Sequence, residues 1–430
     1  MNAFAPKLYV IALCGGGDRP IATLDGRTPF EAAETPHLDA LARAGRSGLL
    51  DIIGDDIPPE SDSGAMALLG YDPLTYYTGR GPLEGLGMNF WDPDGSSVAF
   101  RINFASWNPE TRLLDRRTSR DLTDDELGEL VKSVLAEVRL DEDVTLRMTG
   151  FGRHRGILGL SSTTIRLSGQ VTNTDPGFVN KGAFGVPVKV PSAVPQPCLP
   201  TVDDLAAKTT ARLVDEFVAA SAAVLEHHPV NEDRRARGRR PANLILVRDG
   251  GDTLPVLPSF ADQHGLRLSM YGQVPAEHGL SKLINSRFTI AKTGRGQSDL
   301  DFYAELLPTL VADPADVVFA HLKGPDEPGH DGRPDDKVKA IKEIDAGFIG
   351  GLVDALKPDD LLVVTCDHST PCEVGLHTSD PVPAVVYGPG LIPDTVTTFG
   401  ERAAAGGGLP VSRGHSLLAP LLAQMKARRR

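Results

Sequence analysis

Five short apolar runs along the chain have the composition of buried strands. Leucine, isoleucine and valine dominate most of them, and segments with helical spacing separate them. The runs are residues 8–13, 243–247, 317–322, 361–366 and 384–387. Strands that are apolar on both faces are typical of a parallel sheet that helices cover on both sides. The pattern therefore predicts an α/β fold: a mostly parallel sheet with helices on both faces.

Helical candidates lie between these runs. The clearest begins at Thr123, which forms a capping-box sequence with Glu126 and is followed by leucines and valines on one face up to Val138. Residues 203–226 and 335–356 show the same spacing. These segments would supply helices that cover the sheet.

The middle of the chain follows a different pattern. Short alternating runs occur at residues 144–148 and 163–167, and proline is frequent between residues 186 and 200. This mixture predicts an inserted α+β domain at residues 89–240, with the remaining domain made from both ends of the chain.

The segment 228–241 connects this insertion back to the sheet and carries a cluster of arginines. We expect a charged, solvated loop here. The alternative is that one of these arginines contacts a phosphate.

Composition and charge narrow the class of protein. Of the 430 residues 41% are hydrophobic and 23% are charged, which is typical of a globular chain rather than a disordered one. The net charge of −13 argues against binding a nucleic-acid polymer or an anionic membrane, but a small anionic substrate needs only a local basic pocket.

The location of the protein is predicted from what the sequence lacks. Four cysteines are too few for a disulfide framework, and no apolar stretch approaches the ~20 residues of a membrane span. The apolar N-terminal run is followed by no cleavage signal, so we interpret it as a first strand. The sequence therefore predicts a cytoplasmic protein.

Polar side chains follow two of the predicted strands at the point where each strand ends. Asp326 and His330 come after the run at 317–322, Asp367 and His368 come after the next run, and His377 follows nine residues later. Ligands of open α/β sheets bind at the carboxyl ends of strands, and Asp and His are ligands of Zn²⁺ and Mn²⁺. The spacing of Asp326 and His330 would place both on one face of a helix. The sequence thus predicts a divalent metal site for phosphoryl transfer or hydrolysis.

Ser61 is the candidate nucleophile. It precedes a run of small residues that predicts a helix start, and a helix N-terminus favours an anion such as a phosphoserine. The alternative is that Ser61 only caps the helix.

Longer stretches match a known family in the same order along nearly the whole chain. The most specific are HLKGPDEPGHDG at 321–332, TCDHSTP at 365–371 and HTSDPVP at 377–383. The others include residues 17–20, 28–51, 68–87, 98–105, 113–120, 174–176 and 227–234. The chain resembles the cofactor-independent phosphoglycerate mutases of the short, archaeal type, within the alkaline phosphatase superfamily.

The resemblance implies a fold and a metal site. The fold would be an alkaline-phosphatase-like sheet domain from residues 1–88 and 241–430, which binds metal, with a substrate domain inserted at 89–240. Two divalent ions, Mn²⁺ or Zn²⁺, would be bound. One would be held by Asp326, His330 and His377, and the other by Asp367, His368, Ser61 and an aspartate at the end of the first strand.

The resemblance also implies roles in catalysis and substrate binding. Ser61 would take the phosphoryl group and return it to the other hydroxyl of the glycerate. Asp115 would orient an arginine or handle the proton of the acceptor hydroxyl, and Arg117 would act beside it. The residues implied to bind phosphate and carboxylate are Arg80, Arg101, Arg116, Arg120, Arg155 and Lys282.

Two positions depart from the family pattern. Cys14 stands where the family has the aspartate of the first strand. Its thiolate would bind Zn²⁺ well and Mn²⁺ poorly, or it is merely buried and the second metal is weakened or absent. After Ser61 the family usually reads Gly-Ser-Asp-Thr-Ala-His, whereas here Ala65 replaces the histidine and Glu60 adds negative charge.

Three functions follow from these observations. The first is a metal-dependent phosphotransferase that interconverts 2- and 3-phosphoglycerate or acts on a close analogue. The second is a repurposed transferase that moves a phosphoryl or phosphonyl group from an activated donor, such as a nucleotide, onto a phosphoglycerate-like acceptor. The third is a non-catalytic protein that binds a phosphorylated metabolite.

Overall fold

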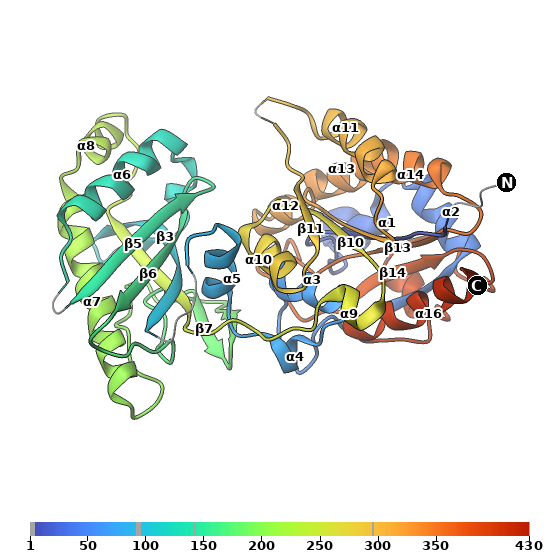
Figure 1. Cartoon of the computed structure of the whole chain (residues 1–430). Helices are drawn as coiled ribbons and strands as arrows, with labels where there is room; N and C mark the ends of the chain where they lie inside the picture. The colour runs from blue at the N-terminus through green and yellow to red at the C-terminus, as the bar shows by residue number, and fades with distance from the viewer. Residues whose placement is uncertain (1–4, 92–95, 141–142, 295, 430) are drawn as a thin grey trace. The chain divides into compact units, whose positions relative to one another are not determined.

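The chain folds into two compact units, shown in the computed structural model of Figure 1. One unit is made from both ends of the chain, Met1–Tyr77 and Val256–Arg430, and the other is the continuous segment Thr78–Pro255. The structure describes residues 5–91, 96–140, 143–294 and 296–429.

The second unit extends beyond the expected insertion at residues 89–240 at both ends. Both α5 (Arg80–Gly87) and β9 (Leu244–Gly251) belong to the second unit, although we expected them in the domain made from the chain ends. Close packing explains the difference, because a Cβ added at Gly81 in α5 would lie 2.6 Å from two carbonyl oxygens of that unit.

A seven-stranded sheet forms the centre of the first unit. Its strand order is β11-β10-β12-β1-β13-β14-β2. The first five strands are parallel, whereas β14 and β2 are each antiparallel to the preceding strand in this order. The bounds are β1 Leu8–Leu13, β2 Arg46–Leu50, β10 Leu268–Gly272, β11 Arg287–Ile290, β12 Val317–Leu322, β13 Leu361–Thr365 and β14 Val382–Tyr387.

Most of the predicted strands are confirmed. The runs at 8–13, 317–322 and 361–366 form the neighbouring parallel strands β1, β12 and β13, and the run at 384–387 lies in β14. The run at 243–247 was assigned to the wrong sheet: it begins β9, which pairs with a strand of the second unit. An apolar run shows that both faces of a strand are buried, but it does not show which sheet buries them.

Helices cover both faces of this sheet, as predicted. In Figure 1, α11, α13 and α14 lie on one side of it and α9 and α16 lie on the other. The helices of this unit are α1 Pro29–Ala32, α2 Pro36–Ala44, α3 Ser61–Leu68, α4 Pro73–Tyr76, α9 Phe260–His264, α10 Pro275–Leu283, α11 Asp299–Ala312, α12 Asp326–His330, α13 Pro334–Ile344, α14 Gly350–Ala355, α15 Glu401–Ala405 and α16 Leu418–Arg428. The helix predicted at 335–356 is α13 and α14, joined by the π-helical turn Asp345–Ile349.

The second unit is an antiparallel sheet covered by helices. Its strands follow the order β4-β3-β6-β5, and β9 also pairs with β3. The strands are β3 Ser97–Asn108, β4 Leu113–Asp115, β5 Val144–Phe151 and β6 Arg155–Ser162, with a separate hairpin of β7 Phe178–Lys181 and β8 Phe184–Pro187. The helices besides α5 are α6 Asp124–Glu137, α7 Leu205–Glu226 and α8 Pro229–Ala236. Apolar side chains of α6 and α7 pack with those of β3 and β6 in one core.

Local predictions in this unit have mixed outcomes. The capping box at Thr123 is confirmed, since its side chain and that of Glu126 each accept from the other's backbone N–H. The alternating run at 163–167 forms no strand. The predicted solvated loop at 228–241 is wrong: it contains α8, and Arg234 is fully buried.

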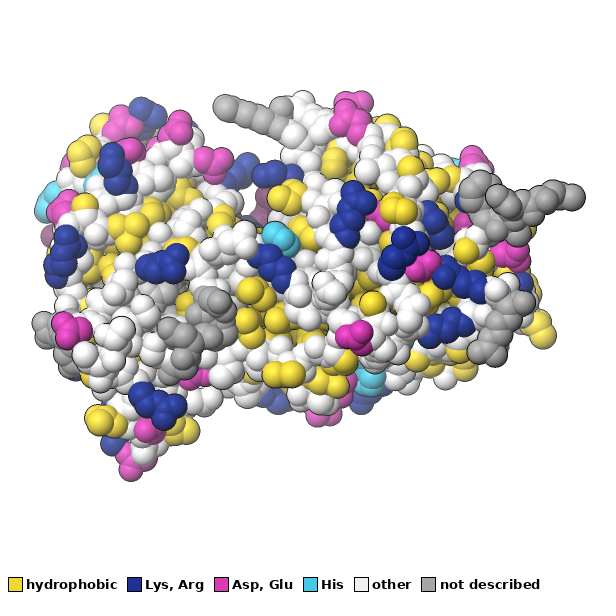
Figure 2. Space-filling view, in the orientation of Figure 1, with side chains coloured by type: hydrophobic (Ala, Val, Ile, Leu, Met, Phe, Trp, Pro, Cys, Tyr) yellow, Lys and Arg dark blue, Asp and Glu magenta, His cyan; other side chains and the backbone are white. Residues whose placement is uncertain are grey.

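Charged side chains of both signs are interspersed on the face seen in Figure 2. Exposed ion pairs of the chain include Arg237 with Asp233 and Arg333 with Asp336. Such pairs contribute little to stability. Within the described ranges, no helix has the length and apolar character needed to cross a membrane.

Candidate active site

Polar residues follow three adjacent strands at one edge of the seven-stranded sheet. Cys14 comes directly after β1, Lys323 directly after β12, and Asp367 two residues after the end of β13. Strand β1 lies between β12 and β13 and is parallel to both. The carboxyl ends of the three strands therefore meet, at the kind of edge where α/β sheets bind ligands.

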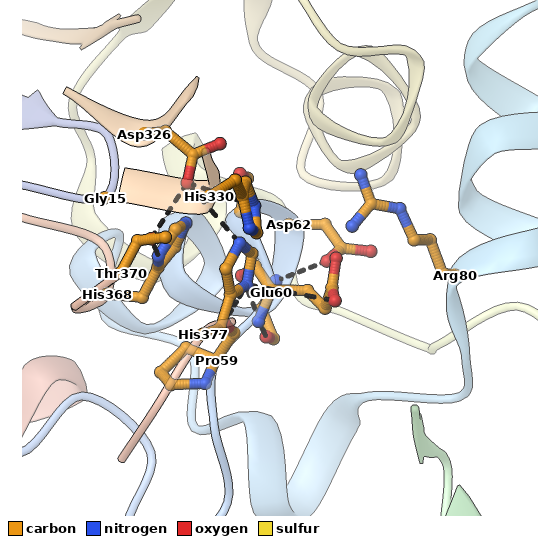
Figure 3. A network of polar contacts seen from close by, with 12 residues as sticks. Gly15, Pro59, Glu60, Asp62, Arg80, Asp326, His330, His368, Thr370 and His377 are labelled. Carbon is orange, nitrogen blue, oxygen red and sulfur yellow. Dashed lines mark hydrogen bonds and ion pairs between the residues drawn. The ribbon is translucent and has the colours of Figure 1, made fainter. Parts of the chain in front are cut away.

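The first group of candidate metal ligands is Asp326, His330 and His377 (Figure 3). Asp326 and His330 lie four residues apart in α12, as predicted, and Nε2 of each histidine is 3.5 Å from Oδ1 of Asp326. Nδ1 of His330 donates to the carbonyl oxygen of Gly375 at 3.0 Å, and Nδ1 of His377 donates to that of Pro59 at 2.9 Å. Because a carbonyl only accepts, Nδ1 carries the proton and the Nε2 lone pair is available, as in metal-binding histidines.

The charges in this group also suit a cation. Burial would raise the pKa of Asp326, but His330, His377 and Lys323 hold it well below its usual range. Burial, helped by His377 and His368 and opposed by Asp326, lowers the pKa of His330 to about 4. At neutral pH the group therefore offers an ionised carboxylate and a neutral imidazole, the forms that bind a metal.

The second group centres on Cys14, Asp367 and His368. Sγ of Cys14 lies 3.5 Å from Oδ2 of Asp367 and 3.8 Å from Nε2 of His368. All three residues are completely buried. Burial and Asp367 would raise the pKa of Cys14, but nearby Lys323 and His321 outweigh them and lower it. Cys14 therefore occupies the place of the expected aspartate with its sulfur pointing toward the predicted ligands.

Ser61 lies beside this second group. It is the first residue of α3, it is buried, and its Oγ is 3.6 Å from Sγ of Cys14 and 3.1 Å from Nζ of Lys323. Helix α3 reaches this place because Gly64 has no side chain: an added Cβ would lie 2.6 Å from the carbonyl oxygen of Asp367. The positive end of the helix then favours negative charge on Ser61.

Sequence analysis missed two residues at this edge, the half-buried Lys323 and the buried His321. Nζ of Lys323 lies 2.6 Å from Sγ of Cys14, and Nε2 of His321 lies 2.9 Å from Oδ2 of Asp367. The other ring nitrogen of His321 bonds Glu277. A signal was available, because a histidine within the apolar strand β12 and a lysine just after it are unusual for a buried strand.

The second unit holds a cluster of buried arginines. Nε of Arg80 and Nη1 of Arg101 both donate to Oε1 of Glu84, at 2.8 and 2.5 Å. Arg248 on β9, which sequence analysis also missed, pairs across the sheet with Arg101. Burial, Arg80 and Arg248 lower the pKa of Arg101 to about 9. Among the described residues, Nε of Arg101 and Nε of Arg248 have no acceptor, so this cluster has the character of an anion-binding site.

Two more of the predicted arginines lie near this cluster. Arg155 is on β6, opposite Asn103 of β3. Burial is the largest cause that lowers the pKa of His154, to about 2, and the positive charges of Arg155, Arg120 and Arg101 lower it further. The structure therefore brings Arg155 and Arg120 into the same positive environment as Arg101.

The remaining predicted residues are placed differently. Arg116 forms a two-pronged ion pair with Asp175, and the backbone N–H of Arg117 donates to Oδ1 of Asp115 at 2.9 Å. Lys282 lies on α10 in the first unit, where burial lowers its pKa. The roles of these residues stay predictions.

Comparisons with known proteins point to one family. A family model described as 2,3-bisphosphoglycerate-independent phosphoglycerate mutase matches residues 42–231. Relatives of that name from Methanopyrus kandleri and Archaeoglobus fulgidus are 38% and 37% identical to this chain, over 96% of it and over 94% and 96% of their own lengths.

Two solved structures match over nearly their full length. A protein from Pyrococcus horikoshii is 29% identical, with a TM-score of 0.76, and the match covers 99% of this chain and 98% of that one. Cofactor-independent phosphoglycerate mutase from Thermoplasma acidophilum is 28% identical, with a TM-score of 0.58, over 98% of this chain and 99% of that one. Taken with the identity to the curated relatives, this shows that the chain belongs to the family of 2,3-bisphosphoglycerate-independent phosphoglycerate mutases.

Proposed function

We propose that the protein interconverts 2- and 3-phosphoglycerate through a phosphoryl group carried on Ser61. The observation that carries this proposal is the position of Ser61: its buried Oγ lies at the N-terminus of α3, 3.1 Å from the ammonium group of Lys323 and next to the metal-binding side chains. Membership of the family supports the same activity.

Ser61 would take and return the phosphoryl group. A bond forms between Oγ of Ser61 and phosphorus, the bond between phosphorus and the glycerate oxygen breaks, and the serine proton passes to that oxygen. The second half reverses these steps at the other hydroxyl of the glycerate. Lys323 favours the ionised serine oxygen, and the N-terminus of α3 stabilises the phosphoserine.

We include a divalent metal, Mn²⁺ or Zn²⁺, in this proposal. When bound, such an ion neutralises phosphate charge and lowers the pKa of a coordinated hydroxyl. The residues that would hold one ion are Asp326, His330 and His377. Those that would hold a second are Asp367, His368 and Ser61, together with Cys14, whose sulfur lies 3.5–3.8 Å from an atom of each.

The proposed function also requires residues that bind the anionic groups of the substrate. We propose that the phosphate and carboxylate of the substrate are bound by Arg80, Arg101, Arg116, Arg120, Arg155 and Lys282. Asp115 would orient an arginine or handle the proton of the acceptor hydroxyl, and Arg117 would act beside it. The cytoplasmic location stays a prediction from sequence.

Conversion of 3-phosphoglycerate into 2-phosphoglycerate by the metal-loaded protein tests this function. We expect Ser61→Ala to abolish turnover and Ser63→Ala to retain it. Ser63 is a matched control because it lies two residues away and its Oγ only bonds the backbone of Glu60. Equal activity of the wild type and Ser61→Ala would contradict a phosphoserine route.

One observation favours the repurposed transferase as a second candidate. Oε1 of Glu60 lies 3.8 Å from Nδ1 of His377, at the N-terminus of α3, where negative charge opposes a phosphoserine. Direct transfer between two bound substrates would need no phosphoserine. Incubation with phosphoglycerate labelled in its phosphate separates the two functions: label on Ser61 supports the mutase, and turnover of an activated donor by Ser61→Ala supports the transferase.

A further inference from the structure

The donor atoms around Cys14 have the separations of a tetrahedral zinc site. Sγ of Cys14 lies 3.5 Å from Oδ2 of Asp367, 3.8 Å from Nε2 of His368 and 3.6 Å from Oγ of Ser61. Nε2 of His368 is 3.2 Å from Oδ2 of Asp367. Tetrahedral bonds of ~2.3 Å to sulfur and ~2.0 Å to nitrogen or oxygen give separations of about 3.5 Å from sulfur and about 3.3 Å between the lighter atoms. The sulfur, Oδ2 of Asp367 and Nε2 of His368 are therefore spaced as three ligands of an ion the size of Zn²⁺, and Oγ of Ser61 has the separation from the sulfur expected of a fourth.

Neighbouring residues orient two of these donors. The backbone N–H of Gly15 donates to Oδ1 of Asp367 at 2.9 Å, which leaves Oδ2 on the side of the sulfur. Oγ1 of Thr370 bonds Nδ1 of His368 at 3.0 Å, which leaves Nε2 on that side. Hydrogen bonds to the outer atoms of the ligands are a regular feature of metal sites.

The thiolate determines which ion this group prefers. Sulfur is a soft ligand that binds Zn²⁺ strongly, whereas Mn²⁺ prefers oxygen ligands. The group of Asp326, His330 and His377 contains only oxygen and nitrogen donors.

We propose that Cys14, Asp367, His368 and Ser61 form a zinc-selective thiolate site, which discriminates against Mn²⁺ more strongly than the group of Asp326, His330 and His377. This inference rests on the metal dependence within the proposed function, and not on the identity of the substrate.

Lys323 competes with zinc for the sulfur. Its Nζ lies 2.6 Å from Sγ of Cys14 and 3.1 Å from Oγ of Ser61, so the ammonium group can neutralise the thiolate without a metal. The lysine stem is flexible, and Nζ can leave the sulfur while it stays near the serine. If Nζ of Lys323 stayed paired with the sulfur of Cys14, zinc could not bind to this site.

Cobalt binding to the full-length protein tests the proposal. Co²⁺ is a spectroscopic substitute for Zn²⁺, and a thiolate bound to it gives an intense near-ultraviolet charge-transfer band. We expect this band in the wild type, its loss on adding Zn²⁺, and its absence from Cys14→Asp. Cys198→Ser is the matched control, because Cys198 is a buried thiol of the second unit whose Sγ donates to the carbonyl oxygen of Thr172.

Metal content gives a second readout. In an excess of Mn²⁺, the wild type should retain at least one Zn²⁺ per chain. Without the soft thiolate, Cys14→Asp should bind Zn²⁺ at this site more than about tenfold more weakly. A wild type without the cobalt band, or with the zinc affinity of the variant, would overturn the proposal. If Cys14→Asp does not fold, the band of the wild type and its displacement by zinc still decide. A protein with the band but without mutase activity would refute the proposed substrate and leave the zinc site intact.

Discussion

Glu401 is a half-buried residue whose surroundings favour the protonated form of its carboxyl group. Burial raises its pKa to about 7, although the hydroxyl of Thr28 and the backbone N–H of Asp18 both donate to it. In the unfolded chain a glutamate titrates near 4.5. The folded chain therefore binds more protons than the unfolded chain between these values, so the free energy of unfolding falls as pH rises from about 4.5 to about 7.

We expect Glu401→Gln to remove this part of the pH dependence. Relative to the wild type, the variant should gain stability between about pH 5 and about pH 8, by up to about 2 kcal/mol. Urea denaturation at the two pH values measures the difference, and Glu110→Gln at an exposed position is the control. The same pH slope in Glu401→Gln and wild type would contradict the assignment.

At the scale of residues, sequence predicts local pairs better than distant ones. The spacing of Asp326 and His330 predicts their common helix face, and α12 confirms it. Lys323 and Arg248 went unnoticed because their surroundings depend on which strands become neighbours. That Arg248 pairs with Arg101 follows from the register of β3 and β9, two strands far apart in the sequence.

Helix α3 illustrates how an element positions the proposed nucleophile, Ser61. All eight of its residues are buried, and Gly64 lets it approach the carbonyl oxygen of Asp367 closely. In Gly64→Ala the added methyl group would push Ser61 away from Lys323. We expect turnover to fall by at least about tenfold, since a displacement near 1 Å in an active site costs that much or more.

Gly128→Ala is the control for this prediction. Gly128 also lies within a helix, α6, but an added Cβ there meets no atom within 4 Å. We expect unchanged turnover and a free energy of unfolding higher by about 0.5–1 kcal/mol. Equal turnover in the two alanine variants would show that the packing of α3 does not position Ser61.

Helix α8 differs most from its prediction, because a solvated loop was expected where this helix forms. Nη2 of Arg234 donates to Asp121 at 2.5 Å, Nη1 lies 3.5 Å from Glu126, and Nε donates to a backbone carbonyl oxygen. Because Arg234 is fully buried, we expect Arg234→Ala to lower the free energy of unfolding by about 2 kcal/mol. Arg237→Ala, just after the end of the same helix, removes only an exposed ion pair and should cost less than about 0.5 kcal/mol. Denaturant unfolding of the two variants compares them directly, and equal losses would contradict the buried role of Arg234.

Helices and strands were predictable where the hydrophobic pattern alone determines the type of element. The apolar runs of β1, β12 and β13 predict buried parallel strands, because only a covered sheet buries both faces. The same argument misplaced β9, which helices of the second unit cover instead. The arginines before residue 241 look solvated in sequence, but the acidic partners of Arg234 lie more than a hundred residues earlier.

At the scale of the molecule, the two units carry different candidate binding groups. The donor groups for metal, Asp326 and Cys14 with their partners, all belong to the first unit. The second unit, residues 78–255, is a continuous segment with its own sheet and core and contains the arginine cluster. A segment with its own core can unfold separately, and a metal that binds only the folded first unit stabilises only that unit.

Calorimetry of the full-length protein should therefore show two unfolding transitions, of which Mn²⁺ or Zn²⁺ shifts only one. At a free metal concentration of 100 Kd the stabilisation is about 2.7 kcal/mol. The transition that does not shift should coincide with that of an isolated 78–255 segment, which identifies the second unit. Asp326→Ala should weaken the metal-dependent shift and leave the other transition in place. A single transition, shifted as a whole by metal, would mean that the two units unfold together. Metal binding to the first unit would then also stabilise the second unit with its arginine cluster.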